Sequence, residues 1–82
     1  MYSIEFSQSA EKQLYGLEKE IQLRVLNVLE RIRIRPFHFI KRKQGTPYFI
    51  LRIGEHRAIL DVRPEKSIIF VVELGHRKNI YD

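Results

Sequence analysis

The sequence contains no cysteine, so no disulfide can stabilise the fold and no cysteine-based metal site can form. It also contains no apolar run of the length that crosses a membrane. Its first residues, MYSIEF, lack the basic and apolar segments of a secretory signal peptide. We therefore expect a soluble intracellular protein of the cytoplasm that has no contact with a membrane.

Several catalytic signatures are missing as well. The sequence has no glycine-rich phosphate loop, no paired catalytic carboxylates and no serine nucleophile motif. Two of its histidines, His38 and His56, have no metal-ligand spacing, and we interpret them as structural. We therefore expect neither a metal ion nor another cofactor.

The chain is short and basic. With 82 residues it forms one domain, residues 1–82, and a domain of this size buries only about 60–65% of the surface of its unfolded chain. Fifteen Lys and Arg residues against ten Asp and Glu residues give a net charge of +5. Six of the basic residues and no acidic one lie between Arg31 and Lys43, so the positive field is local. Such a field favours polyanionic or acidic partners.

The spacing of apolar residues predicts the first half of the fold. Residues 2–6 alternate with the period of a half-buried strand. A serine, Ser7 or Ser9, can then cap a short first helix. A second helix is expected over residues 19–35, because its apolar residues recur on one continuous face and Pro36 disfavours helix in the residue before it.

Three strands follow a connection formed by residues 37–43. Residues 48–53 and 56–63 are expected to form a hairpin around a two-residue turn, Gly54-Glu55, with a positive φ at the glycine. A strongly apolar strand then covers residues 66–74. The sequence therefore predicts an α+β fold of the order β-α-α-β-β-β, in which an antiparallel sheet has a helical hairpin packed on one face and its other face open.

The hairpin register places Arg52 directly opposite Arg57, on the same face of the sheet. Two guanidinium groups about 5 Å apart repel each other by roughly 1 kcal/mol at the dielectric constant of water and by roughly 3 kcal/mol at a value of ~20. A fold gains nothing from this arrangement unless an anion occupies the site. The pair therefore indicates an anion-binding function.

The same register divides the hairpin between two faces. The face expected to receive the helices has Phe49, Leu51, Ile53, Ala58, Leu60 and Val62. The open face has an apolar floor with an aromatic ring, the arginine pair and a carboxylate, contributed by Tyr48, Ile50, Arg52, Arg57, Ile59 and Asp61. The next strand adds Phe70 and Val72 to this floor, with Val72 expected beside Arg57. Because Gly75 is expected to end that strand near Arg57, the tail should bring three further side chains to the pair, those of His76, Arg77 and Tyr81.

Three patterns link the chain to a known family. The hairpin reads Y-x-x-x-R-x-G-x-x-R-A-I, the C-terminus reads G-H-R-x-x-x-Y, and the first helix opens with F-S-x-x-A-x-x-x-L. With the helical hairpin and the Pro-terminated second helix, these patterns resemble the RelE/ParE superfamily of toxin–antitoxin toxins, in its RelE-like branch, over essentially the whole chain.

The resemblance implies a toxin held in a hetero-oligomer with a tightly bound, acidic, RelB-like antitoxin. A RelE-like toxin enters the ribosomal A site and cleaves mRNA, whereas ParE-like toxins inhibit DNA gyrase by binding and generally lack the nuclease residues. A degenerate toxin that only binds RNA or its antitoxin is a third alternative. The matched catalytic positions are Arg52, Arg57, Arg77 and Tyr81, and a strand lysine of some members is absent because Ile50 lies near its position.

These residue types suit metal-independent RNA cleavage, in which a 2′-hydroxyl attacks the adjacent phosphate and a 2′,3′-cyclic phosphate results. Arg52, Arg57 and Arg77 would stabilise the charge that develops on the phosphate. Because arginine stays protonated, Tyr81 is the candidate base or base-orienting group, and His76 is an alternate acid or base. The candidate RNA- and ribosome-binding residues are Arg31, Arg35, Lys41, Arg42 and Lys43, with Tyr48 stacking on a base.

Each candidate residue also has a purely structural interpretation. The arginine pair can consist of surface residues that pair with Asp61 or Glu55. Tyr81 can cover a sheet edge, Tyr48 can belong to the rim of the core, and His76 can be an incidental polar residue. The basic segment can be a solvated helix end that the helix macrodipole favours. The sequence alone leaves these alternatives open.

Overall fold

In the computed structural model, residues 1–78 are described, and they form two α-helices, five strands and two short 3-10 helices. The elements are β1 (Ser3–Phe6), α1 (Gln8–Tyr15), α2 (Lys19–Ile32), β2 (Ile40–Arg42), β3 (Phe49–Ile53), β4 (His56–Arg63) and β5 (Ile68–His76). One 3-10 helix, Pro36–His38, precedes β2, and the other, Pro64–Lys66, connects β4 to β5. The predicted order β-α-α-β-β-β is confirmed, with the short strand β2 added. No helix within residues 1–78 is long and apolar enough to span a membrane.

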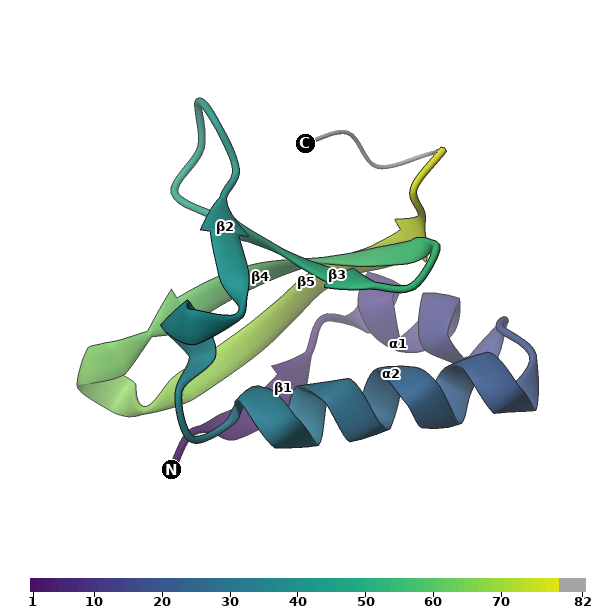
Figure 1. Ribbon diagram of the computed structural model, residues 1–82, viewed down its shortest axis with the longest axis horizontal. Helices are drawn as coiled ribbons and strands as arrows, with labels where there is room; N and C mark the ends of the chain where they lie inside the picture. Colours follow the sequence, from purple (N-terminus) through teal and green to yellow (C-terminus); the bar gives the residue numbers. More distant parts are fainter. Residues whose placement is uncertain (79–82) are drawn as a thin grey trace.

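The strands form one sheet in the order β1-β5-β4-β3-β2. Neighbouring strands are antiparallel except at one edge, where β1 runs parallel to β5. The sheet is therefore mixed rather than wholly antiparallel. The helical hairpin carries the chain from one edge strand, β1, to the other, β2, and three reversals then return it to β5 beside β1 (Figure 1).

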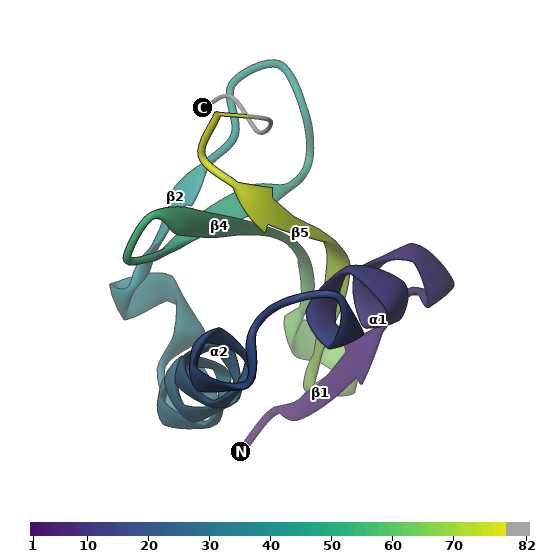
Figure 2. The ribbon, with the colours of Figure 1, turned by 90° about the vertical axis from the view of Figure 1, so that its right-hand side faces the viewer.

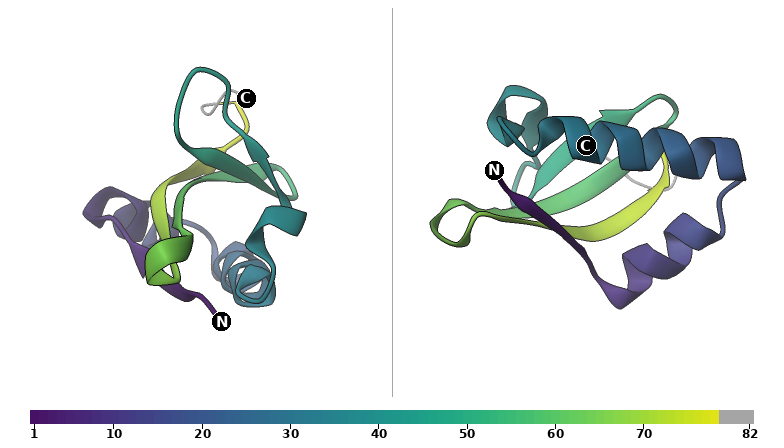
Figure 3. Two further views of the ribbon diagram at one scale, coloured as in Figure 1. Left: turned by 90° about the vertical axis from the view of Figure 1, so that its left-hand side faces the viewer. Right: turned by 90° about the horizontal axis from the view of Figure 1, so that it is seen from below.

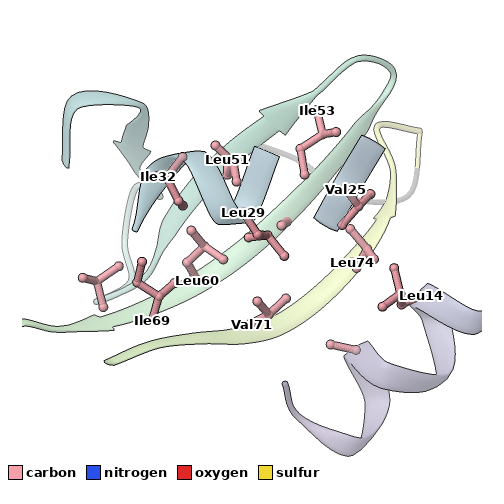
Figure 4. Packing of buried hydrophobic residues seen from close by; sticks show 13 residues of the cluster. Leu14, Val25, Leu29, Ile32, Leu51, Ile53, Leu60, Ile69, Val71 and Leu74 are labelled. Carbon is pink, nitrogen blue, oxygen red and sulfur yellow. The ribbon is translucent and has the colours of Figure 1, made fainter. Parts of the chain in front are cut away.

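Both helices cover the same face of the sheet. Figures 2 and 3 show α1 and α2 on one side of the curved sheet, while the segment between β2 and β3 extends on the other side. The buried cluster between the layers consists of Ala10, Leu14, Val25, Leu29, Ile32, Leu51, Ile53, Ala58, Leu60, Val62, Ile69, Val71 and Leu74 (Figure 4). This confirms the predicted assignment of the helix-facing residues of the hairpin, with Phe49 packed at the edge of the cluster.

The β3–β4 hairpin has the predicted register. Arg52 is paired with Arg57, and Ile53 with His56, across a two-residue turn. Gly54, the first turn residue, has a φ of +58°. A glycine at this position fits the right-handed twist of a tight hairpin, because only glycine adopts such a backbone conformation without a steric cost.

A β-bulge interrupts the pairing of β4 with β5. Leu60 pairs with Val71, whereas the preceding residue, Ile59, pairs with Glu73, so Val72 is the extra residue. Regular alternation from Val71 would direct Glu73 into the core and Leu74 out of it. The bulge reverses this, since Glu73 is exposed and Leu74 is only 1% exposed. It thereby avoids the burial of an ionised carboxylate, which would cost several kcal/mol.

The first helix satisfies the backbone groups near the bulge. The hydroxyl of Ser7 donates to the carbonyl oxygen of Val72 (2.7 Å) and accepts a hydrogen bond from the N–H of Ala10 (2.9 Å), which caps α1. One turn further on, Oε1 of Gln13 accepts a hydrogen bond from the N–H of Leu74 (2.7 Å). Helix α1 is thus fixed to the irregular part of β5 by polar contacts as well as by apolar packing.

Three local expectations from the sequence are corrected. Helix α2 ends at Ile32 rather than at residue 35, because Arg33 leaves the helix and its Nε donates to the carbonyl oxygen of Tyr2 (2.7 Å). The segment interpreted as a connection contains strand β2, which pairs with β3. Strand β5 does not end at Gly75 but continues to His76, because the bulge keeps its last residues paired with the start of β4.

Replacing Ser7 by alanine should lower the free energy of unfolding by about 1–2 kcal/mol, because the change removes a helix cap and leaves the carbonyl oxygen of Val72 without this donor. Ser9→Ala, on the exposed side of the same helix, is the matched control and should stay within about 0.5 kcal/mol of the wild type. Urea denaturation of the two variants measures the difference. Equal stabilities would contradict the structural role given to Ser7.

Candidate functional site

The face of the sheet opposite the helices carries two adjacent rows of side chains near the hairpin turn. One row consists of Arg52, Arg57 and Gly75, and the next of Lys41, Ile50, Ile59 and Glu73. Ile50 and Ile59 are 7% and 6% exposed, so they form a floor beneath longer side chains. The open face therefore combines cationic groups with an apolar base, as the sequence predicted.

A groove of about 470 Å³ lies over this part of the sheet. Its lining residues come from the end of the first 3-10 helix, from β2 and the segment after it, and from the hairpin: Phe39, Lys41, Arg42, Gln44, Ile50, Arg52 and Arg57. Lys41 lies diagonally across from Arg52, a spacing of about 7–8 Å between backbones that long side chains can bridge. Three strands thus direct cations toward one groove.

The arginine pair occupies the closer of the two spacings of an antiparallel ladder. The N–H of Arg77 donates to the carbonyl oxygen of Glu55 (2.9 Å), so the backbone of the next residue, His56, points toward β3 instead. Pairing alternates from there, which makes Arg52 and Arg57 a non-hydrogen-bonded pair with Cα atoms about 4.5 Å apart. The two guanidinium groups can therefore contact a single phosphate together.

His76 does not lie where the sequence placed it. It is paired with His56, and the two rings meet edge to face at 5.4 Å on the side of the sheet that the helices cover. Because the bulge adds one residue to β5, every side chain after it changes face. The expectation that His76 approaches Arg57 on the open face is therefore wrong, and the expectation that Val72 lies beside Arg57 is wrong for the same reason, since Gly75 occupies that place.

The two remaining tail residues of the predicted site are Arg77 and Tyr81. Nε of Arg77 forms an ion pair with a carboxylate oxygen of Glu55 (3.1 Å), so Arg77 lies at the hairpin turn and is not among the groove residues. Both partners are more than half exposed, and an exposed pair of this kind stabilises a fold by at most about 1 kcal/mol, which leaves the guanidinium available to a ligand. Tyr81 lies outside the described residues.

Tyr48 belongs to the opposite end of the open face. It is half-buried, directly precedes β3 and lies four positions before Arg52, which corresponds to about 13 Å of extended chain. Asp61 and Arg63 lie near Tyr48, and the Arg63 guanidinium donates three hydrogen bonds to the Asp61 carboxylate, the shortest of 2.9 Å. These hydrogen bonds with Asp61 raise the pKa of Arg63. The structural alternative in which Asp61 pairs with Arg52 or Arg57 is thereby disfavoured, because Asp61 pairs with Arg63.

The basic segment from residue 31 to residue 43 is spread over several surfaces. Arg31 lies in the last turn of α2, and Arg35 precedes the first 3-10 helix. Lys41 faces the groove, whereas Arg42 lies over the ring of Phe49 at 5.6 Å, and the backbone N–H of Lys43 donates to Tyr48. The basic segment thus supplies two residues of the groove, Lys41 and Arg42, and its other basic residues lie on neighbouring surfaces.

One titratable residue of the open face was missed by the sequence reasoning. Glu73 is exposed in the row next to Arg57, and the bulge places it there. The signal was present in the sequence, because a glutamate in phase with Ile69 and Val71 predicts an irregularity in the strand. Within residues 1–78 no group of three or more His, Asp or Glu side chains is arranged to hold a metal ion.

Residues 4–81 match the sequence model of a protein family described as the ParE toxin of the type II toxin–antitoxin system parDE. This chain belongs to that toxin family. No match is found among curated protein sequences. The resemblance to the RelE/ParE superfamily is confirmed, while the choice of the RelE-like branch stays a prediction.

Solved structures of RelE toxins have the same fold as this ParE-family toxin. A chain of the RelBE2 complex from Mycobacterium tuberculosis matches with a TM-score of 0.83 and 22% identity, covering 93% of this chain and 98% of that one. A chain of the RelE–RelB complex from Pyrococcus horikoshii gives 0.80 and 22%, covering 96% and 98%. A chain of the RelBE complex from E. coli gives 0.79 and 22%, covering 93% and 96%. The shared architecture thus extends over at least 93% of this chain.

Replacing Arg52 by glutamine should raise the free energy of unfolding of the toxin at low salt by about 0.2–1 kcal/mol, because it removes like charges that face each other across the strands. The gain should shrink at high salt, where exposed charges are screened. Urea denaturation at two sodium chloride concentrations measures it. Arg63→Gln, which removes a guanidinium paired with Asp61, should give no such gain. A loss of stability in Arg52→Gln at low salt would contradict the repulsion.

Proposed function

We propose that this toxin is a metal-independent endoribonuclease that cleaves mRNA on the ribosome. The observation that supports the proposal best is the groove on the open face, where Lys41, Arg52 and Arg57 converge from three strands above a nearly buried apolar floor. A scissile phosphate bound between the arginines would relieve their repulsion. The neighbouring aromatic and aliphatic side chains, Phe39 and Ile50, suit the bases of a single strand.

The reaction requires no group that the chain lacks. The 2′-oxygen forms a bond to phosphorus, the bond from phosphorus to the 5′-oxygen breaks, and a 2′,3′-cyclic phosphate and a 5′-hydroxyl result. One proton leaves the 2′-hydroxyl for a base, and another reaches the departing 5′-oxygen. Arg52, Arg57 and Lys41 stabilise the extra negative charge of the pentavalent phosphate. Such electrostatic stabilisation of the transition state is usually the largest single contribution to catalysis.

The proton acceptor is assigned to one of two side chains. Tyr81 is the candidate that the family pattern indicates, and Glu73 is the candidate that the position of the bulge adds. A carboxylate is ordinarily ionised at neutral pH and can accept a proton in that form, whereas a tyrosine is ordinarily protonated. His76 is not assigned a catalytic role, because it occupies the other face of the sheet.

The remaining basic residues would hold the toxin on ribosomal RNA. Lys41, Arg42 and Lys43 follow one another along the edge strand β2 and the segment after it. Arg31 lies in the last turn of α2, and Arg35 precedes the first 3-10 helix. Contacts of this kind with phosphates set register and affinity without reading sequence. Tyr48, farther along the open face, would stack on a base beyond the cleavage site.

A cognate acidic antitoxin is the expected partner, and the relatives described as RelE–RelB complexes support this assignment. The toxin offers two edge strands, β1 and β2, and exposed apolar side chains on the outer side of α2, those of Leu23 and Leu26. A partly disordered antitoxin in the cytoplasm would wrap these surfaces as a helix or as an added strand and cover the basic groove.

Toeprinting on translating ribosomes tests the nuclease activity. The wild-type toxin should create new mRNA ends in the A site, and Arg57→Ala should slow their formation by about 10²–10³-fold. Arg63→Ala, on the same strand and the same face, should leave cleavage unchanged because it lies far from the groove. Wild-type cleavage by Arg57→Ala would refute the site. Glu73→Gln and Tyr81→Phe then identify the base, since loss of a general base slows the reaction by about 10²–10⁴-fold.

Inhibition of DNA gyrase by binding is the second candidate function. The family model that matches this chain is that of ParE, and the strand lysine of some RelE-like toxins is replaced near Ile50, whose side chain forms the groove floor. If this function is the correct one, the toxin should block supercoiling by gyrase without creating RNA ends, and Glu73→Gln should retain the block. Gyrase that stays fully active at toxin concentrations that stop translation would exclude it.

A further inference from the structure

A second group of basic side chains lies at the tip of the β3–β4 hairpin, on the side that faces the helices. We name the side chains of Arg24, His56 and His76 the tip cluster. His56 and His76 are a directly opposed pair on neighbouring strands, with ring centroids 5.4 Å apart. Because the adjacent residues Glu55 and Arg77 share the backbone hydrogen bond, the two histidines occupy a non-hydrogen-bonded position, where side chains approach most closely.

Arg24 reaches the same place from α2. Its Nη1 atom lies 3.1 Å from the position that a β-carbon would take on Gly54, so the guanidinium rests against the glycine of the turn. Its charge also acts on His56. The glycine therefore serves two purposes here, since it allows the positive φ of the turn and leaves room for the guanidinium.

The charges around the tip cluster are unbalanced. Among residues 1–78, the acidic side chain that acts on His56 is that of Glu55, and this carboxylate is already paired with Arg77. The pKa of His56 is lowered, first by burial and then by the neighbouring His76, with a smaller lowering by Arg24. Burial and the neighbouring cations oppose a positive charge on the imidazole of His56 in the free protein. An anion bound at the cluster would favour the charged imidazole and offset the effect of the cations.

We propose that Arg24, His56 and His76 form a second phosphate-binding site, on the opposite side of the hairpin tip from the groove. The site takes one phosphate of an RNA strand. Its affinity increases as the pH falls, because protonation of His56 adds a positive charge and a charged donor. Only the identification of the ligand as RNA rests on the proposed function; the phosphate chemistry rests on the cluster itself.

The hydrogen bonding of His76 favours an anion over a metal ion. Its Nδ1 accepts a hydrogen bond from the backbone N–H of Lys78 (3.2 Å), so in the neutral ring the proton resides on Nε2. That nitrogen is therefore a donor rather than a metal ligand. The guanidinium of Arg24 beside the ring of His56 also disfavours a divalent cation and attracts a phosphate.

The groove and the tip cluster are placed so that one continuous RNA strand can contact both. Arg52 and Arg57 lie on one side of the hairpin within a few residues of the turn, and the tip cluster lies on the other side of the same residues. An RNA strand that passes over the turn would place one phosphate on each side. The RNA would then contact the hairpin tip at two phosphates. The second contact would fix the position of the scissile phosphate in the groove, which electrostatic attraction alone would not do.

NMR of the histidine side chains tests the site in the full-length toxin. Sulfate is the probe, because it mimics a phosphate but does not titrate in the range of histidine. Sulfate should raise the pKa of His56 and shift the resonances of His56 and His76, while the exposed His38 serves as an internal control. Sulfate affinity should increase by about threefold to tenfold between about pH 8 and pH 5.5. Equal sulfate shifts at all three histidines would overturn the proposal.

A salt titration with a short single-stranded oligoribonucleotide tests the ligand. Arg24→Gln should weaken binding and reduce the slope of log K against log salt by about 0.7, the value for one lost phosphate contact on a single strand. His56→Gln should have this effect at about pH 5.5 and a smaller one at about pH 8, since only the protonated imidazole adds a charge. The matched controls are Lys66→Gln, at the far end of the sheet, and His38→Gln, and both should keep the wild-type slope. An equal loss in Arg24→Gln and Lys66→Gln would overturn the site, and so would binding of polyglutamate to the cluster in preference to RNA.

The two experiments distinguish a failure of the nuclease proposal from a failure of the second phosphate site. If toeprinting finds no mRNA cleavage but Arg24→Gln still reduces the salt slope, the nuclease proposal fails and the phosphate site stands. If cleavage is normal and the salt slope of Arg24→Gln equals that of the wild type, the second site fails and the groove stands. Folding of each variant is checked by the resonances of core methyl groups, and Arg24→Lys, which retains the charge, should restore most of the slope.

Discussion

The length of the turn between β3 and β4 is the constraint on which the structure depends. Two residues, Gly54 and Glu55, fix the register, and the register decides which side chains meet the helices. A slip of β3 by one residue would move Arg52 into the core and Leu51 and Ile53 out of it. A buried, unpaired guanidinium costs several kcal/mol, a large share of the free energy that separates a small domain from its unfolded state. The same alternation that builds the core therefore places both arginines on the open face.

The bulge in β5 solves a conflict that the hairpin register creates. Strand β5 has to follow β4 along its whole length, but its sequence changes phase at Val72, so that regular pairing would bury Glu73 and expose Leu74. The extra residue leaves backbone groups that need partners, and α1 supplies these from Ser7 and Gln13. Core packing, the cap of α1 and the position of Glu73 are thus consequences of one irregularity. The bulge also determines that the end of β5 presents a histidine to the helix side and a glycine to the open face.

The sequence was sufficient for features that follow from local rules. Alternation and the glycine turn predicted the hairpin, its register and both of its faces, and periodicity predicted the two helices. It was insufficient where distant segments decide the outcome. The parallel pairing of β1 with β5 depends on the path of the whole chain, and β2 is a strand of three residues that exists because β3 offers it an edge. The location of His76 depended on the bulge, whose signal, a glutamate in phase with Val71, is visible only when the burial of each residue is followed along the strand.

The distribution of charge at the hairpin tip connects stability with function. Arg52 and Arg57 lie on one side and Arg24 with two histidines on the other, while the carboxylate at the turn, Glu55, is held by Arg77. Like charges gathered within a few residues raise the free energy of the unbound fold, and a ligand that neutralises them lowers it again. A ligand that binds only the folded state stabilises that state by mass action. The core is built from the other face of the same strands, so the fold tolerates like charges on its open face.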